Sequence, residues 1–142
     1  MPRIKLNELP VYPFSTEIPV RITDINYGGH LGNDSLLSLI HEARIQFLAS
    51  LGYSELDCGG VSLIMTDSAI VYKTEVFAGD VLKFEIGAYE ISRTGFRISY
   101  KITKRRDNVL AALAETGMLA FDYKNKKLSP LPKPTIERLR SC

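Results

Sequence analysis

One segment of this chain has the periodicity of an amphipathic helix, and segments with the periodicity of strands lie on both sides of it. Within residues 35–51 apolar side chains recur at spacings of three and four, and Gly52 follows as a C-terminal stop. Asn33 or Asp34 is expected to cap the N-terminus. About 17 residues correspond to roughly 25 Å, so this helix is expected to lie across a sheet.

The other regular segments favour an antiparallel sheet. Residues 11–23 predict an edge strand, because Pro13 and Pro19 interrupt their apolar residues and proline is confined to edges and bulges. Short, turn-like connections predict that the later strands are antiparallel neighbours. Four segments are β-branched and apolar or alternate between apolar and polar side chains: residues 62–76, 80–91, 96–103 and 109–123.

Together these elements predict an α+β domain in which a curved antiparallel sheet of about five strands wraps around one long central helix. No repeat or linker divides the sequence, which predicts a single domain over residues 1–142, with its core at about 14–132 and a basic C-terminal tail. One sheet around one helix leaves a strand edge unpaired. Residues 62–76 or 109–123 are expected to pair with another copy, giving a homodimer or homotetramer.

Composition excludes several classes of function. The hydrophobic fraction of 45% is ordinary for a globular protein, and the net charge of +2 is too mild to indicate nucleic-acid binding. No apolar run approaches the roughly 20 residues of a membrane helix, and the first residues lack a signal-peptide pattern. Cys58 and Cys142 show no metal-binding spacing. We expect a cytoplasmic protein without metal, cofactor, membrane or nucleic-acid partner.

The polar, glycine-rich loop at residues 24–34 leads directly into the predicted helix. A helix N-terminus presents unpaired N–H groups and partial positive charge, which stabilise an oxyanion that develops during acyl transfer. Gly28 and Gly29 permit positive φ and close approach of the backbone to a substrate. The amides near Gly29 and His30 are therefore predicted to form an oxyanion hole.

Four groups of residues occur in this order along the chain. They are Asp24-x-Asn26-x-x-Gly-His30-x-x-Asn33, then Glu42-Ala43-Arg44, then Tyr72 with Phe77-x-Gly79-Asp80, and a last strand that ends in a basic, proline-containing tail. As a set they resemble the hot-dog fold acyl-CoA thioesterases, a superfamily that includes 4-hydroxybenzoyl-CoA and plant acyl-carrier-protein thioesterases. The resemblance covers about residues 14–132 and implies the hot-dog fold and thioester hydrolysis.

The sequence departs from the 4-hydroxybenzoyl type at one catalytic position. That type carries a second aspartate two residues after the first, where this chain has Asn26, and an amide cannot act as a carboxylate nucleophile or general base. The plant type has Asp-x-[Asp/Asn] and a histidine at the position of His30, so this chain is similar to that arrangement. Asn26 is predicted either to polarise the thioester carbonyl or hold a water, or to be a turn residue.

Three further residues are candidates for proton transfer. His30 is the leading general base because imidazole titrates near neutral pH; its alternative role is to shape the loop through backbone hydrogen bonds. Asp34 is first of all a cap and alternatively orients His30 or takes its proton. Glu42 is either a catalytic carboxylate or a structural partner of Arg44 or His41.

Other candidates lie beyond the helix. Asp67 falls inside an apolar strand, where unpaired carboxylates are rarely buried. In a hot-dog dimer this strand approaches the other subunit's loop, so the resemblance makes Thr66 and Asp67 site residues in trans. Arg93 and Arg97 are candidates for contacts with CoA phosphates, with a solvated turn as the alternative. The predicted substrate-binding set is Gly28, Gly29, Asn33, Leu36, Thr66, Arg93 and Arg97.

The sequence thus predicts hydrolysis of an acyl-CoA thioester, with water activated near His30 and the oxyanion held at the N-terminus of the central helix. A thioester of acyl-carrier protein is the second substrate class. Two alternatives stay open: an acyl-thioester dehydratase or hydratase on the same fold, and a non-catalytic acyl-thioester-binding protein.

Overall fold

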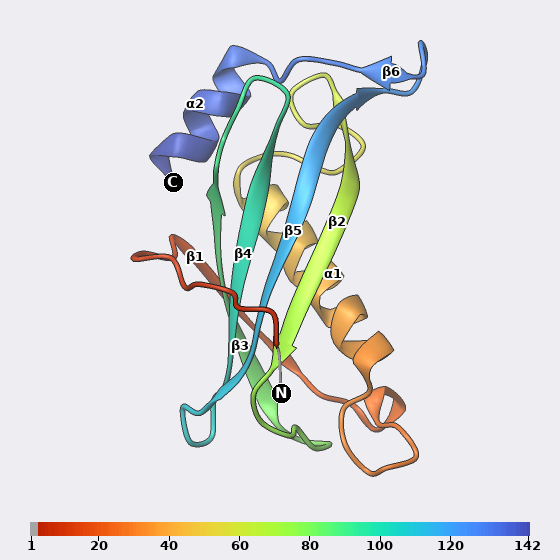
Figure 1. Cartoon of the computed structure of the whole chain (residues 1–142), viewed down its shortest axis with the longest axis vertical. Helices are drawn as coiled ribbons and strands as arrows, with labels where there is room; N and C mark the ends of the chain where they lie inside the picture. Colours follow the sequence, from red (N-terminus) through yellow and green to blue (C-terminus); the bar gives the residue numbers. More distant parts are fainter. Residues whose placement is uncertain (1–2) are drawn as a thin grey trace.

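The structure, a computed structural model, describes residues 3–142 as one six-stranded antiparallel sheet with a long helix on one face and a short C-terminal helix (Figure 1). The predicted α+β architecture is confirmed. In chain order the elements are β1 (Phe14–Pro19), the 3-10 turn η1 (Ile22–Asp24), α1 (Asn33–Ser50), β2 (Ser62–Tyr72), β3 (Val81–Tyr89), β4 (Gly95–Lys104), β5 (Leu110–Asp122), β6 (Lys127–Leu128) and α2 (Lys133–Ser141).

The strand order decides which strand has a free edge. The order is β1-β3-β4-β5-β2, with the two-residue β6 beside the end of β5. Because β5 pairs with β4 on one side and with β2 on the other, the expectation of a free edge at residues 109–123 is wrong. The alternative, residues 62–76, is correct: β2 pairs only with β5 and forms one edge of the sheet.

Two boundaries differ from the sequence-based expectation. The first strand ends at Pro19, and the alternation beyond it belongs instead to the turn η1, because proline cannot donate to a strand ladder. The N-cap of α1 is Gly32 rather than Asn33 or Asp34. The Gly32 amide donates to the Asp24 carbonyl over 3.0 Å, and this tie brings the chain into the helix one residue earlier.

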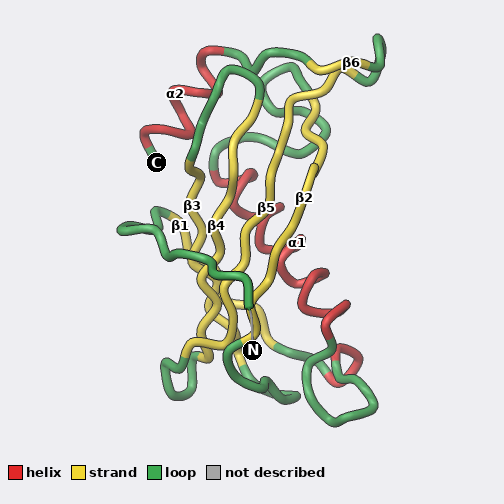
Figure 2. The backbone as a smooth tube through the Cα atoms, in the orientation of Figure 1, coloured by secondary structure: helices red, strands yellow, loops and turns green. Residues whose placement is uncertain are grey.

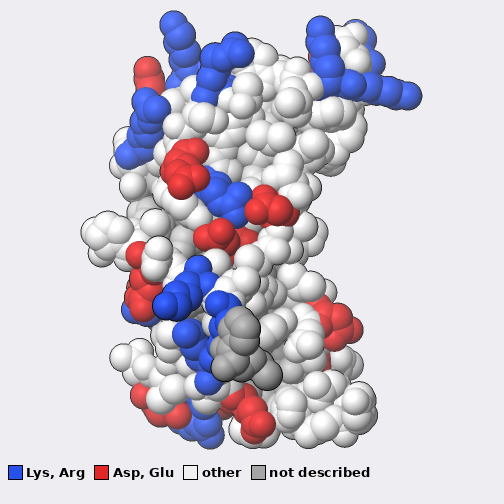
Figure 3. Space-filling model, in the orientation of Figure 1, with Lys and Arg blue, Asp and Glu red and all other residues white. Residues whose placement is uncertain are grey.

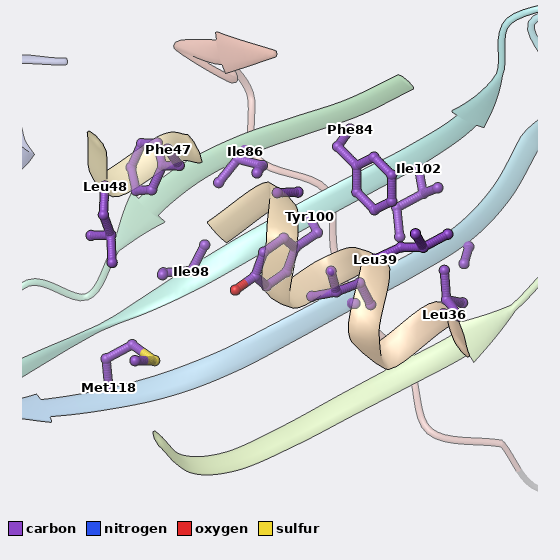
Figure 4. Close-up of a cluster of buried hydrophobic side chains, with 14 of the residues drawn as sticks. Leu36, Leu39, Phe47, Leu48, Phe84, Ile86, Ile98, Tyr100, Ile102 and Met118 are labelled. Atoms are coloured by element: carbon purple, nitrogen blue, oxygen red, sulfur yellow. The ribbon is translucent and has the colours of Figure 1, made fainter. Parts of the chain in front are cut away.

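The core lies between α1 and the inner face of the sheet (Figure 4). Phe47 and Leu48 of α1 are fully buried, as are Phe84 and Tyr100 of the facing strands. Figure 4 shows these side chains meeting between the helix and the strands. Burial of a large apolar side chain is worth about 1.5–3 kcal/mol, so this layer fixes α1 and with it the loop at its N-terminus.

The outer face of the sheet is covered in part by the segment before β1, which crosses in front of the strands in Figure 2. Leu9 packs over Gly87, where a Cβ would come within 2.8 Å of its Cδ1, and the Tyr12 hydroxyl lies 3.1 Å from Ser99 Oγ. Figure 3 shows acidic and basic side chains interspersed over the middle of this face. Within residues 3–142, neither helix combines the length and apolar character of a membrane span.

Candidate active site

The loop between η1 and α1 is held by Asp24. Its buried carboxylate accepts a hydrogen bond from the Arg21 amide (2.9 Å), and its carbonyl accepts one from Gly32 (3.0 Å). Both ends of the loop are therefore tied to one residue. Asp24 thus braces the loop through backbone hydrogen bonds.

Asn26 closes the tip of the same loop. Its Oδ1 accepts the amides of Gly28 (2.9 Å) and His30 (3.4 Å), and its carbonyl accepts that of Gly29 (3.1 Å). The structure thus places Asn26 as a turn residue, the second of its two predicted roles. It also engages the amides near Gly29 and His30 that were expected to form the oxyanion hole, because the turn at Gly29, with φ of +85°, directs them back to Asn26.

His30 projects from this turn toward the segment that follows β2. Its Nε2 lies 4.0 Å from Glu75 Oε1, and its ring lies edge-on to Phe77 with centroids 6.4 Å apart. Gly28 leaves room for the imidazole, since a Cβ there would lie 3.4 Å from Nε2. The hydrogen bond from the Leu31 amide to the Val76 carbonyl (2.7 Å) holds the two segments together.

A pocket of about 270 Å³ opens beside His30, and we call it the His30 pocket. Its apolar part comes from the first turn of α1 and from the inner face of the sheet. Its polar part comes from the loop and from the end of β2, where partial burial raises the pKa of the Tyr72 phenol. Its lining includes His30, Asn33, Leu36, Tyr72, Glu75 and Ala112.

The N-terminus of α1 offers free donors at this pocket. The Gly32 carbonyl accepts the Leu36 amide (3.0 Å), the first bond of the helix. The amides of Asn33, Asp34 and Ser35 find no acceptor among the described residues. These groups, together with the helix dipole, suit an oxyanion. The free backbone donors beside the loop are therefore those of Asn33–Ser35, whereas the amides of Gly29 and His30 are bonded to Asn26.

Two carboxylates proposed for the helix lie away from His30. Asp34 is exposed in the first turn, its Oδ1 directed over Gly32, and no ion pair joins it to His30 within residues 3–142. Glu42 is exposed and accepts a hydrogen bond from Gln46 Nε2 over 3.2 Å. Arg44 pairs instead with Glu55, at 2.7 Å. His41 Nε2 also lies beside Glu55, at 3.6 Å, so the expected structural pairing of Glu42 with Arg44 or His41 is wrong.

Asp67 and Arg97 lie on the outer face of the sheet, opposite the His30 pocket. Arg97 binds Asp67 through two hydrogen bonds (3.1 and 2.9 Å) and Glu115 through one (2.9 Å). The hydrogen bond from Arg97 is the main cause that lowers the pKa of Asp67, and Thr66 adds a second. Within the protomer, Arg97 is engaged with carboxylates and not free for phosphate. Arg93 lies in the β3–β4 turn, at the opposite end of the sheet from the loop (Figure 1).

Glu75 and Lys73 line the pocket but belong to none of the sequence motifs. Tyr72, which also lines it, belongs only to the pattern that carries the family resemblance. The one sequence feature that could have indicated these pocket residues is a polar run, Tyr-Lys-Thr-Glu, which ends an apolar strand just before the Phe77-x-Gly79-Asp80 turn. Nothing local shows that this run returns to the His30 loop. No group of three or more potential metal ligands occurs among the described residues.

Comparison with known proteins gives the family. A family profile described as the thioesterase-like superfamily matches residues 20–139. The chain belongs to this superfamily. A relative from Synechococcus elongatus, a 1,4-dihydroxy-2-naphthoyl-CoA hydrolase, is 32% identical over 119 residues, which are 80% of this chain and 85% of the relative.

Solved structures confirm the hot-dog fold. A 1,4-dihydroxy-2-naphthoyl-CoA thioesterase from Synechocystis superposes with a TM-score of 0.81 at 24% identity, covering 89% of this chain and 95% of its own. A Staphylococcus aureus protein in complex with CoA gives 0.83 at 17% identity, covering 95% and 87%. The predicted class, the hot-dog acyl-CoA thioesterases, is confirmed.

Proposed function

We propose that this thioesterase hydrolyses acyl-CoA at the His30 pocket, with His30 as general base. The observation that carries the proposal is that one pocket is lined both by the His30 imidazole and by Asn33, the first residue of α1, at the helix end where the first three amides are free. General-base catalysis by a positioned histidine is typically worth about 10²–10⁴ in rate. Oxyanion donors at a helix N-terminus supply the electrostatic part of the rate enhancement.

The reaction follows from these positions. The thioester carbonyl oxygen lies toward the amides of Asn33–Ser35, and His30 takes a proton from a water that attacks the carbonyl carbon. The tetrahedral intermediate carries its negative charge on the oxygen held by the amides. The C–S bond then breaks, and protonated His30 returns the proton to the CoA thiolate. Asn26 holds the turn that places His30, so no carboxylate at its position is needed.

The experiment is a screen of short, long and aromatic acyl-CoAs, with free CoA and free acid quantified by chromatography. The His30→Ala variant is expected to lose about 10²–10⁴ in kcat, and Tyr27→Ala, a fully exposed change in the same loop, is expected to keep it. Circular dichroism establishes that both variants fold. Unchanged kcat in folded His30→Ala would show that the base lies elsewhere.

We further propose that two copies assemble through the β2 edge, as a homodimer or within a homotetramer. β2 presents an unpaired ladder edge, and Met65 and Leu37 beside it are 49% and 45% exposed. An antiparallel self-pairing satisfies both edges through one two-fold axis. Sedimentation equilibrium is expected to show a dimer or tetramer for the wild type and a monomer for Met65→Lys. A wild-type monomer at micromolar concentration contradicts the assembly. The cytoplasmic location stays a prediction.

A further inference from the structure

A second cavity, of about 310 Å³, lies between α1 and the edge strand β2, on the same face of the sheet as the His30 pocket. We call it the helix–edge cavity. Most of its wall is apolar, but two of its residues are polar and almost fully buried: Arg44 is 5% exposed and Thr116 is 3% exposed. Its lining includes Leu37, Ile40, Arg44, Ser68 and Thr116.

A chain of hydrogen bonds orients the Thr116 hydroxyl. Arg44 Nη1 donates to the Tyr100 oxygen (3.3 Å), and that oxygen lies 2.8 Å from Thr116 Oγ1. Arginine has no acceptor, and Tyr100 is fully buried, so the phenol hydrogen has Thr116 as its acceptor. The hydrogen of Thr116 itself then finds no acceptor among residues 3–142. The helix–edge cavity therefore contains a hydrogen-bond donor without a partner.

Two basic groups line the cavity, Arg44 and His41. Both lie against the same carboxylate oxygen, Glu55 Oε1, at 2.7 and 3.6 Å, so Glu55 behind the wall is their shared counter-ion. A carboxylate in this cavity would approach Glu55 and lose its hydration. The free donor of Thr116 beside these paired charges favours a neutral oxygen acceptor, such as a ketone or a hydroxyl, over an anion.

Both cavities border α1 and β2. Leu36 lines the His30 pocket and Leu37 lines the helix–edge cavity. On β2, Tyr72 belongs to the first and Ser68 to the second, four residues apart on the same face. From Asn33 to Ile40 the helix rises about 10 Å, the length of an extended chain of about eight carbons.

We propose that the helix–edge cavity receives the far end of the acyl group, where Thr116 donates a hydrogen bond to a neutral oxygen carried by the acyl chain. The inference rests on the proposed function, because the thioester must lie in the His30 pocket for the chain to reach this cavity. Thr116 is thus a specificity-determining residue, and acyl groups oxygenated at their far end are better substrates than plain alkyl groups of the same length.

The test compares three eight-carbon substrates: octanoyl-CoA, 7-oxooctanoyl-CoA and octanedioyl-CoA. A single neutral hydrogen bond corresponds to about three- to tenfold, so wild type is expected to prefer 7-oxooctanoyl-CoA over octanoyl-CoA by this factor in kcat/KM. Octanedioyl-CoA, which ends in a carboxylate, is expected to show no such gain. Thr116→Val is expected to bring the ratio of the oxo to the plain substrate close to one.

Two further variants separate the donor from its surroundings. Tyr100→Phe removes the hydrogen bond that orients the Thr116 hydroxyl but keeps the hydroxyl itself, so it is expected to weaken the preference less than Thr116→Val does. Thr103→Val makes the same chemical change at a buried threonine on the outer face and is expected to behave as wild type. Thr116→Ala is the second variant without the hydroxyl, should Thr116→Val not fold.

The outcomes separate the role of Thr116 from the proposed function. Release of CoA with an unchanged oxo preference in folded Thr116→Val or Thr116→Ala overturns the role of Thr116. A preference for octanedioyl-CoA overturns the neutral-oxygen assignment. A Tyr100→Phe preference as fully lost as that of Thr116→Val contradicts the assignment of the donor to the Thr116 hydroxyl. Absence of CoA release from all acyl-CoAs in the screen overturns the proposed function itself.

Discussion

His30 Nε2 lies 4.0 Å from Glu75 Oε1, although 45 residues separate them in the chain. His30 belongs to the loop before α1, and Glu75 to the segment after β2, and the Leu31–Val76 hydrogen bond fixes their separation. The distance exceeds that of a hydrogen bond, and the Glu75 side chain is 67% exposed. Their interaction is a weak, solvent-screened one that exists when the imidazole is protonated.

The first prediction follows from that weakness. An exposed ion pair is worth about 0–1 kcal/mol, so Glu75→Gln is expected to lower kcat by no more than about fivefold. His30→Ala is expected to cost far more, about 10²–10⁴. Steady-state kinetics of the two single variants and the double variant measure the coupling. A loss in Glu75→Gln as large as that in His30→Ala contradicts this and makes Glu75 the base.

The second prediction concerns Asn26, whose side-chain oxygen accepts two loop amides. Asn26→Asp keeps an acceptor at the same position and is expected to keep the turn and most of the activity. Asn26→Ala removes both bonds, each worth about 0.5–1.5 kcal/mol, and is expected to lower both kcat and the melting temperature. Thermal melting curves and kcat values of the Asn26→Asp and Asn26→Ala variants test this prediction. Equal behaviour of the two variants would show that the hydrogen bonds do not hold the loop.

The third prediction concerns Gly117, over which the Asp67–Arg97 ion pair crosses β5. A Cβ there would collide with Asp67 Oδ1 and come within 2.8 Å of Arg97 Nη1. Gly117→Ala is therefore expected to lower the free energy of unfolding by about 1–3 kcal/mol. The ion pair lies on the outer face, so activity is expected to persist.

Urea unfolding measures this cost, and the Asp67→Ala background is the control. Without the carboxylate the severest of three close contacts is gone, while Thr66 Oγ1 at 2.7 Å and Arg97 Nη1 at 2.8 Å remain, so Gly117→Ala is expected to cost less there than in the wild type. The same cost in both backgrounds would rule out the collision with Asp67 as its origin.

The fourth prediction concerns the thiols. Burial is the main cause that raises the pKa of Cys58 to about 11, and the charge of Asp57 adds to it. At pH 8 iodoacetamide is expected to label the exposed Cys142 in the folded protein and to reach Cys58 only in denaturant, as read by mass spectrometry.

The same shift has a consequence for stability. The folded state raises the pKa of this thiol above its ordinary value of 9.0, so it favours the protonated form. The resulting stabilisation is complete below about pH 9 and is lost as the pH rises through about 11. Cys58→Ala is expected to show a shallower decline of unfolding free energy over this range. Identical slopes for the two proteins contradict the burial argument.

Much of this protein was readable from local sequence. The 3.6-residue period of α1 and the period-2 alternation of β4 were readable because the apolar side chains of each element face the core, and their spacing records that face directly. The glycine-rich loop before α1 was predicted to be the site because its polar residues lead into a helix N-terminus. The structure places His30 of this loop in the lining of a pocket.

Tertiary structure alone decided the partners of those residues. Glu75 reaches His30, and Arg44 pairs with Glu55 rather than Glu42, because strand order and helix position bring distant segments together. Asp67 interrupts an apolar strand, yet its face of the sheet follows from the pairing of β2 with β5, including the register shift between Met65 and Asp67. Sequence periodicity specifies that a face is buried, but the element that covers it is set by packing across the whole chain.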